Sequence, residues 1–378
     1  MMSMAGFSLD LGRVFGINIE LHWTFVLLLV IAALYGPVLF LFIVVLFILV
    51  VIHELAHSIT SRNSGIRVKK IVLLPLGGAS IVDLDDASPD TAFRIALAGP
   101  LTSILLALVF GILAAYFVSP PLRQAMQLLF LINVILGVFN LLPAFPLDGG
   151  RVLKSYLERK HGQLEATKIA VTWSKVILVL FVLGSIVYAY MVSYSGNDLI
   201  FLLLWNFVIV IFIYGGAQAE LESAYVMAYT SNIPAYKAMS GNFAIVRPTS
   251  KMRDVYRVLL NKGTHIILFR EGGVIKQVSR TNYPPASRGM AQMLDLPVTS
   301  YGVEIPMIRY DAPLSKAIDK MRYEEVSVAA VLKGRKLMGV LNNQHIESII
   351  ALHMAQEIKK SQAKEKSGLR DGKQELRL

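Results

Sequence analysis

The chain has 378 residues, of which 55% are hydrophobic and only 17% are charged. A mean hydropathy of +0.57 is too high for an ordinary soluble protein and indicates an integral membrane protein with some soluble mass attached. The absence of cysteine excludes disulfides and restricts any metal site to nitrogen and oxygen ligands.

Long apolar runs dominate the first part of the chain. Six of them suggest membrane spans, near residues 21–35, 37–59, 92–118, 124–147, 170–194 and 198–217, and the first is short for a span. Basic residues collect in every second connection, whereas the opposite loops contain only Arg123. Because basic residues mark the cytoplasmic side, we predict a multi-pass protein of the cell membrane with both termini in the cytoplasm.

The second apolar run ends in His53-Glu54-Leu55-Ala56-His57, which fits the HExxH pattern. On a helix the two histidines share one face a turn apart, as two ligands of one zinc ion require. Glu54 can then reach a metal-bound water as a general base. The alternative is a chance match with histidines satisfied by backbone carbonyls, but desolvation at the end of a span penalises ionisable groups and favours the metal site.

A zinc hydrolase needs a third protein ligand and one open position. Asp148 follows the fourth apolar run in FNLLPAFPLDGGRVL, where prolines prevent the helix from continuing. A carboxylate at such a break is suited to reach across to the second run. The alternative is an exposed helix-end Asp beside Arg151, in which case His22 or Glu20 becomes the next candidate ligand.

Two asparagines lie seven residues apart on the fourth run. Asn140, within one to two turns of Asp148, is the better candidate for holding an extended substrate backbone through its amide. Asn133 is interpreted as structural. Residues 68–74 read as a strand before a Pro-Gly break, in a hairpin or at a sheet edge, where they can capture an unwound substrate by β-addition.

The composition changes after residue 218, where 24 Lys and Arg face 15 Asp and Glu. A basic segment beside membrane spans is typical of a cytoplasmic domain, so we do not expect a nucleic-acid partner. Residues 219–242 read as a helical linker and 243–356 as an α/β unit with a gapless internal repeat starting at Val246 and Ile308. Residues 357–378 are charged and predicted to be disordered.

Four motifs in order over residues 14–155 resemble the site-2 protease family of intramembrane zinc metalloproteases: HELAH, VKKIVLLPLGGAS, AGPLTS and NLLPAFPLDGGRVL. The resemblance implies one Zn²⁺ per chain, held by His53, His57 and Asp148. It also implies Glu54 as general base and Asn140 as a substrate-binding residue. The expected partners are the lipid bilayer and a transmembrane protein substrate, cut within or near its membrane segment.

The C-terminal repeat is similar to a tandem pair of CBS domains, which often bind adenine nucleotides. The turns that usually carry a ribose-binding Asp read Ser279-Arg280-Thr281-Asn282 and Asn342-Asn343-Gln344-His345. Because both lack the carboxylate, we predict weak or absent nucleotide binding. The domain is then expected to form a homodimer or to position the substrate.

The predicted fold is therefore a mainly α membrane protein. A six-helix transmembrane metalloprotease domain (1–218) with a small membrane-associated β element precedes the linker and a cytoplasmic α/β CBS-pair-like domain. The alternative function is a CBS-gated transporter or channel with a regulatory zinc site, which predicts polar residues along several spans; here they concentrate at two segment ends. A membrane zincin with a downstream helical Glu ligand is disfavoured, since the later spans contain no ExxxD-type pair.

Overall fold

The computed structural model describes residues 8–352 except 76, 83–86, 118, 193–195, 263, 265 and 279–293. The chain divides into two compact units, Met1–Tyr225 and Val226–Leu378. The predicted subdivision at 218, 242 and 356 remains a prediction, and the charged tail 357–378 lies outside the described residues.

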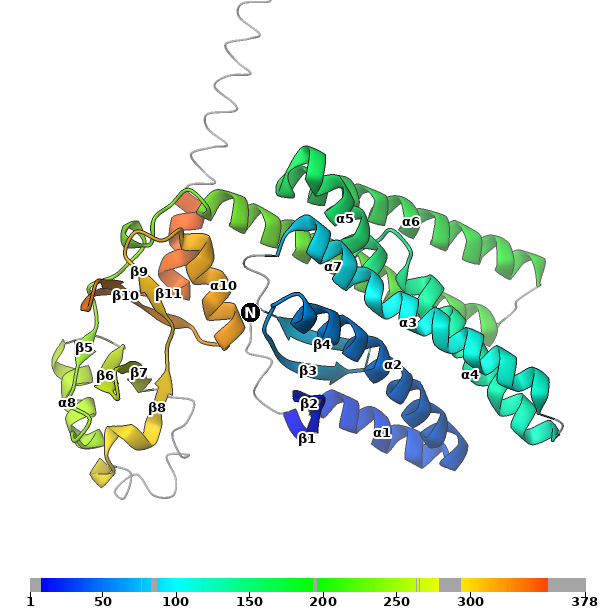
Figure 1. Cartoon of the computed structure of the whole chain (residues 1–378), viewed down its shortest axis with the longest axis horizontal. Coiled ribbons are helices and arrows are strands. Elements are labelled where there is room, and N and C mark those ends of the chain that lie inside the picture. Colours follow the sequence, from blue (N-terminus) through cyan, green and yellow to red (C-terminus); the bar gives the residue numbers. More distant parts are fainter. Residues whose placement is uncertain are drawn as a thin grey trace, which may run out of the picture. The chain divides into compact units, whose positions relative to one another are not determined.

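The first unit is built mainly from helices (Figure 1). They are α1 (Trp23–Tyr35), α2 (Pro37–Asn63), α3 (Pro89–Tyr116), α4 (Pro120–Asn140), α5 (Asp148–His161), α6 (Gln163–Met191) and α7 (Asn197–Thr230). Proline opens α2, α3 and α4, where its fixed φ and missing N–H cost nothing.

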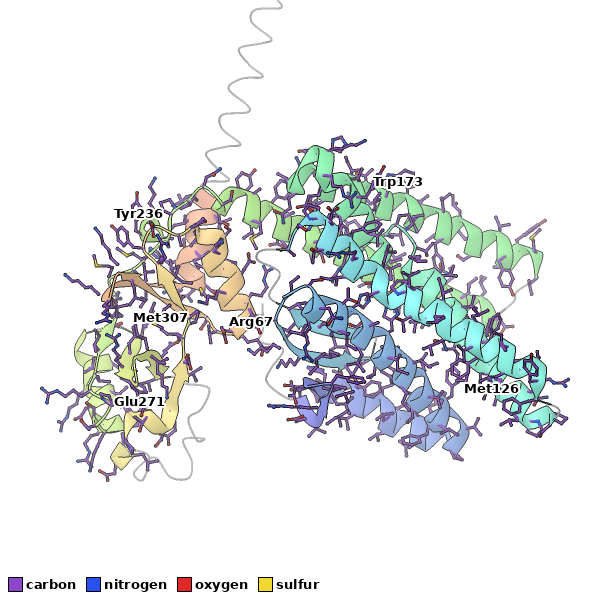
Figure 2. The ribbon with its side chains drawn as sticks, viewed as in Figure 1. Arg67, Met126, Trp173, Tyr236, Glu271 and Met307 are labelled. Carbon is purple, nitrogen blue, oxygen red and sulfur yellow. The ribbon has the colours of Figure 1, made fainter. Side chains whose placement is uncertain are left out.

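Five helices among the described residues are long and apolar enough to cross a membrane: α2, α3, α4, α6 and α7. The predicted count of six is not confirmed. The first predicted span is α1, whose 13 residues reach only about 20 Å at 1.5 Å per residue, short of a bilayer core of about 30 Å. Large apolar side chains stay exposed on the long helices, Trp173 among them (Figure 2), as a lipid-facing surface requires.

A four-stranded sheet lies against α1 and α2 in the order β1-β2-β3-β4. Its strands are β1 (Ser8–Val14), β2 (Ile17–His22), β3 (Val68–Leu74) and β4 (Gly77–Val82). The predicted strand at 68–74 and its hairpin with the following residues are confirmed. However, β3 pairs in parallel with β2 and antiparallel with β4. The expectation that 68–74 captures substrate by β-addition is therefore wrong, since both of its edges are occupied. Among the described strands, β4 has the unpaired edge on this side of the sheet.

The second unit contains the predicted repeat. One copy is β5 (Ala244–Ile245), α8 (Met252–Lys262), β6 (Ile267–Glu271) and β7 (Val274–Val278); the other is β9 (Met307–Arg309), α10 (Leu314–Glu324), β10 (Val328–Lys333) and β11 (Lys336–Asn342). In each copy the first strand pairs in parallel with the second, which forms an antiparallel hairpin with the third. β8 (Gly302–Glu304) pairs with β7 and so extends the sheet of the first copy. Side chains of both sheets share one apolar core, so the repeat folds as a pair.

Candidate metal centre

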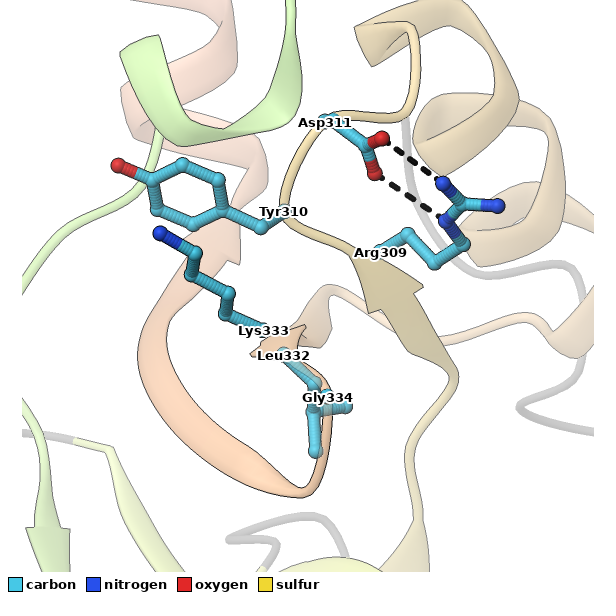
Figure 3. A pocket seen from close by; sticks show the side chains of 6 residues that line it. All are labelled: Arg309, Tyr310, Asp311, Leu332, Lys333 and Gly334. Carbon is cyan, nitrogen blue, oxygen red and sulfur yellow. Dashed lines mark hydrogen bonds and ion pairs between the residues drawn. The ribbon is translucent and has the colours of Figure 1, made fainter.

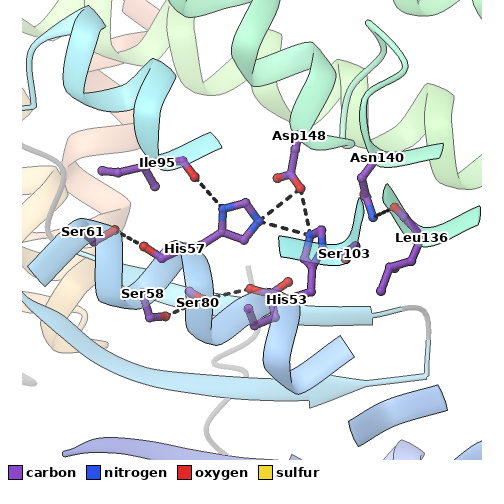
Figure 4. A network of polar contacts seen from close by, with 11 residues as sticks. His53, His57, Ser58, Ser61, Ser80, Ile95, Ser103, Leu136, Asn140 and Asp148 are labelled. Atoms are coloured by element: carbon purple, nitrogen blue, oxygen red, sulfur yellow. Dashed lines mark hydrogen bonds and ion pairs between the residues drawn. The ribbon is translucent and has the colours of Figure 1, made fainter. Parts of the chain in front are cut away.

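Helices α2 and α5 bring three ligand-type atoms together (Figure 4). Asp148 Oδ2 lies 3.0 Å from His53 Nε2 and 3.1 Å from His57 Nε2, and the two imidazole nitrogens are 3.2 Å apart. Both histidines are buried, at 4% and 9% exposure. Among the described residues this is the group of His, Asp or Glu side chains that can hold a metal ion.

The spacing of these atoms fits zinc. Tetrahedral bonds of about 2.0–2.2 Å place ligand atoms about 3.3–3.6 Å apart, within about half an ångström of the observed separations. Space for the ion exists because residue 99 of α3 is glycine. A Cβ there would lie 2.2 Å from His57 Nε2 and 2.6 Å from His53 Nε2. Three protein donors leave a fourth position for water.

Helix α3 orients both imidazole rings through contacts to their Nδ1 atoms. His57 Nδ1 lies 2.7 Å from the carbonyl oxygen of Ile95, and His53 Nδ1 lies 2.9 Å from Ser103 Oγ. A carbonyl only accepts hydrogen bonds, so His57 carries its proton on Nδ1 and leaves Nε2 free for a metal. These contacts supply the outer-shell hydrogen bonds that a metal-binding histidine needs.

Tight backbone packing fixes Asp148 as the first residue of α5. A Cβ at Gly149 would lie 2.2 Å from the Leu142 carbonyl oxygen, so only glycine permits this approach. Before it, the buried Phe145 donates its N–H to Ser174 Oγ of α6 at 2.8 Å. This backbone packing places the Asp148 carboxylate against both histidine rings.

Asp148 is not the exposed helix-end residue of the alternative interpretation. Its side chain is 15% exposed and faces the histidines, whereas Arg151 pairs with Glu220 at 3.4 Å. The two other candidate ligands are engaged elsewhere. Glu20 accepts from Lys70 at 3.0 Å, and His22 caps α1 by accepting from the Thr24 N–H.

Glu54 contacts strand β4. Ser80 Oγ donates to Glu54 Oε2 at 2.9 Å, and a Cβ at Gly78 would lie 2.4 Å from Glu54 Cγ. Sequence reasoning gave no role at the metal centre to Ser80, Gly78 or Gly99, although all three lie in the motifs quoted above, and interpreted Gly78 only as part of the break after the strand. The available signal was a small residue at each position, but its meaning depends on which helix or strand packs opposite.

The asparagines of α4 remain apart from these contacts. Asn140 is partly buried at the end of α4 and donates to the Leu136 carbonyl at 2.9 Å, so its substrate-binding role stays a prediction. Asn133 is fully buried and donates to the Leu129 carbonyl, while its Oδ1 has no hydrogen-bond partner among the described residues.

A shallow pocket of about 300 Å³ lies in the second unit, at the turn between β10 and β11 (Figure 3). Its charges are already engaged: Arg309 makes two hydrogen bonds to Asp311, at 2.8 and 3.1 Å, and Lys333 Nζ lies 5.5 Å from the Tyr310 ring centre. The second of the two turns compared with a ribose-binding turn, residues 342–345, does not line this pocket. There Asn342 Oδ1 accepts from the His345 N–H at 2.7 Å, capping the helix over 343–352. Asn282 lies outside the described residues.

Comparisons with known proteins agree with this chemistry. The profile of Peptidase family M50 matches residues 41–126 and 118–184. A zinc metalloprotease of Methanocaldococcus jannaschii is 29% identical over 364 residues, covering 93% of this chain and 99% of the relative. A solved site-2 protease from the same organism is 35% identical, covering 57% of this chain and 95% of that one, with a TM-score of 0.42.

The second unit has solved neighbours of its own. A CBS domain protein from Pyrobaculum aerophilum, complexed with AMP, is 22% identical over 33% of this chain and 99% of that one, with a TM-score of 0.27. For the membrane unit, the family profile and the sequence identity over nearly the whole relative coincide with a buried His-His-Asp group. The chain belongs to Peptidase family M50, the site-2 proteases, and is a zinc metalloprotease of that family.

Proposed function

We propose that this protein is an intramembrane endopeptidase, which hydrolyses a peptide bond within or near a transmembrane segment of a membrane protein substrate. One observation carries the proposal. The two candidate histidine ligands belong to α2, a 27-residue helix apolar enough to cross a bilayer, and they are buried. A metal centre on such a helix acts at membrane depth, where a soluble substrate does not reach.

His53, His57 and Asp148 are the proposed zinc ligands, with one ion per chain. When bound, zinc supplies a Lewis acid that polarises the scissile carbonyl and lowers the pKa of a water molecule. Glu54 accepts the proton of that water and delivers it to the leaving amine. Ser103 and the Ile95 carbonyl keep the histidine rings in the ligating orientation.

A transmembrane helix must unwind locally before its carbonyls become accessible. The edge of β4 that faces away from β3 offers backbone groups to such an extended stretch. Asn140, at the end of α4, is proposed to hold the substrate backbone through its amide. Both termini are proposed to face the cytoplasm, with residues 243–356 forming a homodimer or positioning substrate. Membership of a protease family argues against the transporter alternative.

The test is cleavage of candidate single-span substrates by purified protein in detergent, with metal analysis of the same sample. The Glu54→Gln variant is the control, since it keeps the proposed ligands and loses the base. Cleavage that requires both zinc and Glu54 supports the proposal. A zinc-loaded chain that cleaves soluble peptides but no membrane-embedded segment would refute the intramembrane assignment.

The docking edge is testable separately because the chain has no cysteine of its own. Ile81→Cys on β4 and Leu9→Cys on β1, at the opposite end of the sheet, are made in the Glu54→Gln background. Oxidation with a single-cysteine substrate should give cross-links through residue 81 and not through residue 9. Equal cross-linking at both positions would contradict docking at β4.

A further inference from the structure

The placement of Glu54 depends on a neighbouring strand as well as on its own helix. A glutamate side chain has three rotatable bonds, so α2 alone does not fix its carboxylate. Strand β4 supplies the restraint, because Ser80 Oγ donates to Oε2 at 2.9 Å. The hydrogen bond leaves Oε1 available for another partner.

The Ser80 hydroxyl is itself placed by α2. Ser58 lies one turn after Glu54 and is 1% exposed, and its hydroxyl oxygen is 3.4 Å from Ser80 Oγ. Since the Ser80 proton points at Glu54, the Ser58 hydroxyl is the donor to Ser80. The three side chains then form one directed chain, from Ser58 through Ser80 to the carboxylate.

Gly78 completes the arrangement. A Cβ there would lie 2.4 Å from Glu54 Cγ and 2.9 Å from Cδ. The glycine therefore leaves a slot in β4 that the carboxylate arm occupies. Two residues of one strand, Gly78 and Ser80, thus define where the arm lies and how its carboxylate is turned.

We propose that Ser80 is a positioning residue for the general base, and that β4 couples the orientation of Glu54 to substrate docking. The inference rests on the proposed function, because the strand that carries Ser80 is also the one whose free edge is proposed to receive the substrate. A substrate strand paired with β4 restricts the motion of this edge strand, and Ser80 transmits that restriction to the base.

The experiment compares Ser80→Ala and Ser80→Thr with the full-length wild-type enzyme in detergent. Loss of the hydroxyl should lower kcat about tenfold, which corresponds to about 1.4 kcal/mol, while KM and zinc stoichiometry stay unchanged. Threonine keeps the hydroxyl and should stay within about threefold of wild type. Ser61→Ala is the control for loss of a serine hydroxyl near the site, since Ser61 is buried on α2 and donates to the His57 carbonyl oxygen rather than to a side chain.

Gly78→Ala supplies a second, independent variant. The added methyl group meets the flexible arm of Glu54 rather than backbone, so the carboxylate moves and the fold remains. It should reproduce the fall in kcat with zinc retained. Binding of acetohydroxamic acid, a zinc chelator whose acidic N–OH proton the base accepts, gives a readout without turnover and should weaken about tenfold in both variants.

The outcomes are distinct. A wild-type enzyme that cleaves membrane substrates together with a Ser80→Ala variant of unchanged kcat would overturn this inference alone. A threonine variant as impaired as the alanine variant would also overturn it, because the hydroxyl would then not be the active feature. A wild-type enzyme that cleaves no membrane-embedded segment would instead refute the proposed function.

Discussion

Gly99 offers the most direct test of the metal centre, because it contacts the proposed ligands without being one. Replacement by alanine places a methyl carbon 2.2 Å from His57 Nε2 and 2.6 Å from His53 Nε2. Carbon and nitrogen atoms in contact need about 3.5 Å, so both rings must retreat by roughly 1 Å. The methyl group also fills the position that a metal ion would take.

The rings cannot retreat freely. Their Nδ1 atoms bond Ile95 and Ser103, which belong to α3 like Gly99 itself. Losing one outer-shell hydrogen bond typically lowers metal affinity about 10–100-fold, so displacement of both rings predicts about 10²–10⁴-fold weaker zinc binding. The helix itself should gain up to about 1 kcal/mol, since alanine favours helix over glycine. Displacing the two rings costs about 1–3 kcal/mol, so the gain in helix propensity should offset part of the cost and limit the loss of stability in the zinc-free protein to about 2 kcal/mol.

Competition with a zinc chelator measures the affinity, and unfolding of the zinc-free protein measures the scaffold. Gly184→Ala is the matched control, because it makes the same change in apolar helix α6 with no atom within 4 Å of the new Cβ. The control should bind zinc like wild type. If Gly99→Ala bound zinc within about twofold of wild type, the proposed ion position between the two histidines would be refuted.

Three further outcomes are expected. Glu54→Gln should abolish cleavage yet keep zinc, because an amide cannot accept the proton of the water; retained turnover in cleavage assays would exclude Glu54 as the base. Burial opposes ionisation of Glu20, but hydrogen bonds from Ser8 and Lys70 hold its pKa below the ordinary value of 4.5. Its contribution to the free energy of unfolding is therefore present above about pH 4.5 and lost as the pH falls through the lowered pKa. Glu20→Gln should accordingly reduce the loss of stability measured as the pH is lowered below 4.5. Calorimetry of the full-length protein with ATP and AMP should show weak or no binding, and micromolar affinity would restore a ligand-sensing role for the second unit.

Local sequence patterns predicted the features that depend on one segment. The histidine spacing predicts two nitrogens on one face of α2, and that is where they lie. The prolines before Asp148 predict the helix break that lets α5 begin there. Within the second unit, the internal repeat predicts two copies of the same strand and helix order.

Features that depend on pairing between distant segments were not predictable in this way. β3 resembles an edge strand in sequence, yet β2, which precedes it by about fifty residues, covers its second edge. The apolar run at 21–35 gives only a 13-residue helix because the residues before it pair as β2. Gly78 and Gly99 read as ordinary small residues until the side chains opposite them are known.

Charge balance gives a final reason for a divalent ion at this centre. Glu54 and Asp148 bring two negative charges into a largely apolar helix bundle. A histidine that binds a metal through Nε2 is neutral, and His57 Nδ1 then keeps its proton for Ile95. One Zn²⁺ brings the total charge to zero. Without the ion this compensation is lost, and burial of uncompensated charge costs several kcal/mol.

Zinc removal should therefore destabilise the protein through this charge as well as through lost ligand bonds. The midpoint of unfolding in detergent, measured at pH 8 with and without chelator, should fall for wild type. The fall should be smaller for Glu54→Gln, because one of the two uncompensated charges is gone while the ligands remain. Equal shifts of the unfolding midpoint in the two proteins would show that the charge of Glu54 does not contribute to the stabilisation by zinc. Its carboxylate would then act on the water alone, and the stability gained from zinc would come from the three ligands.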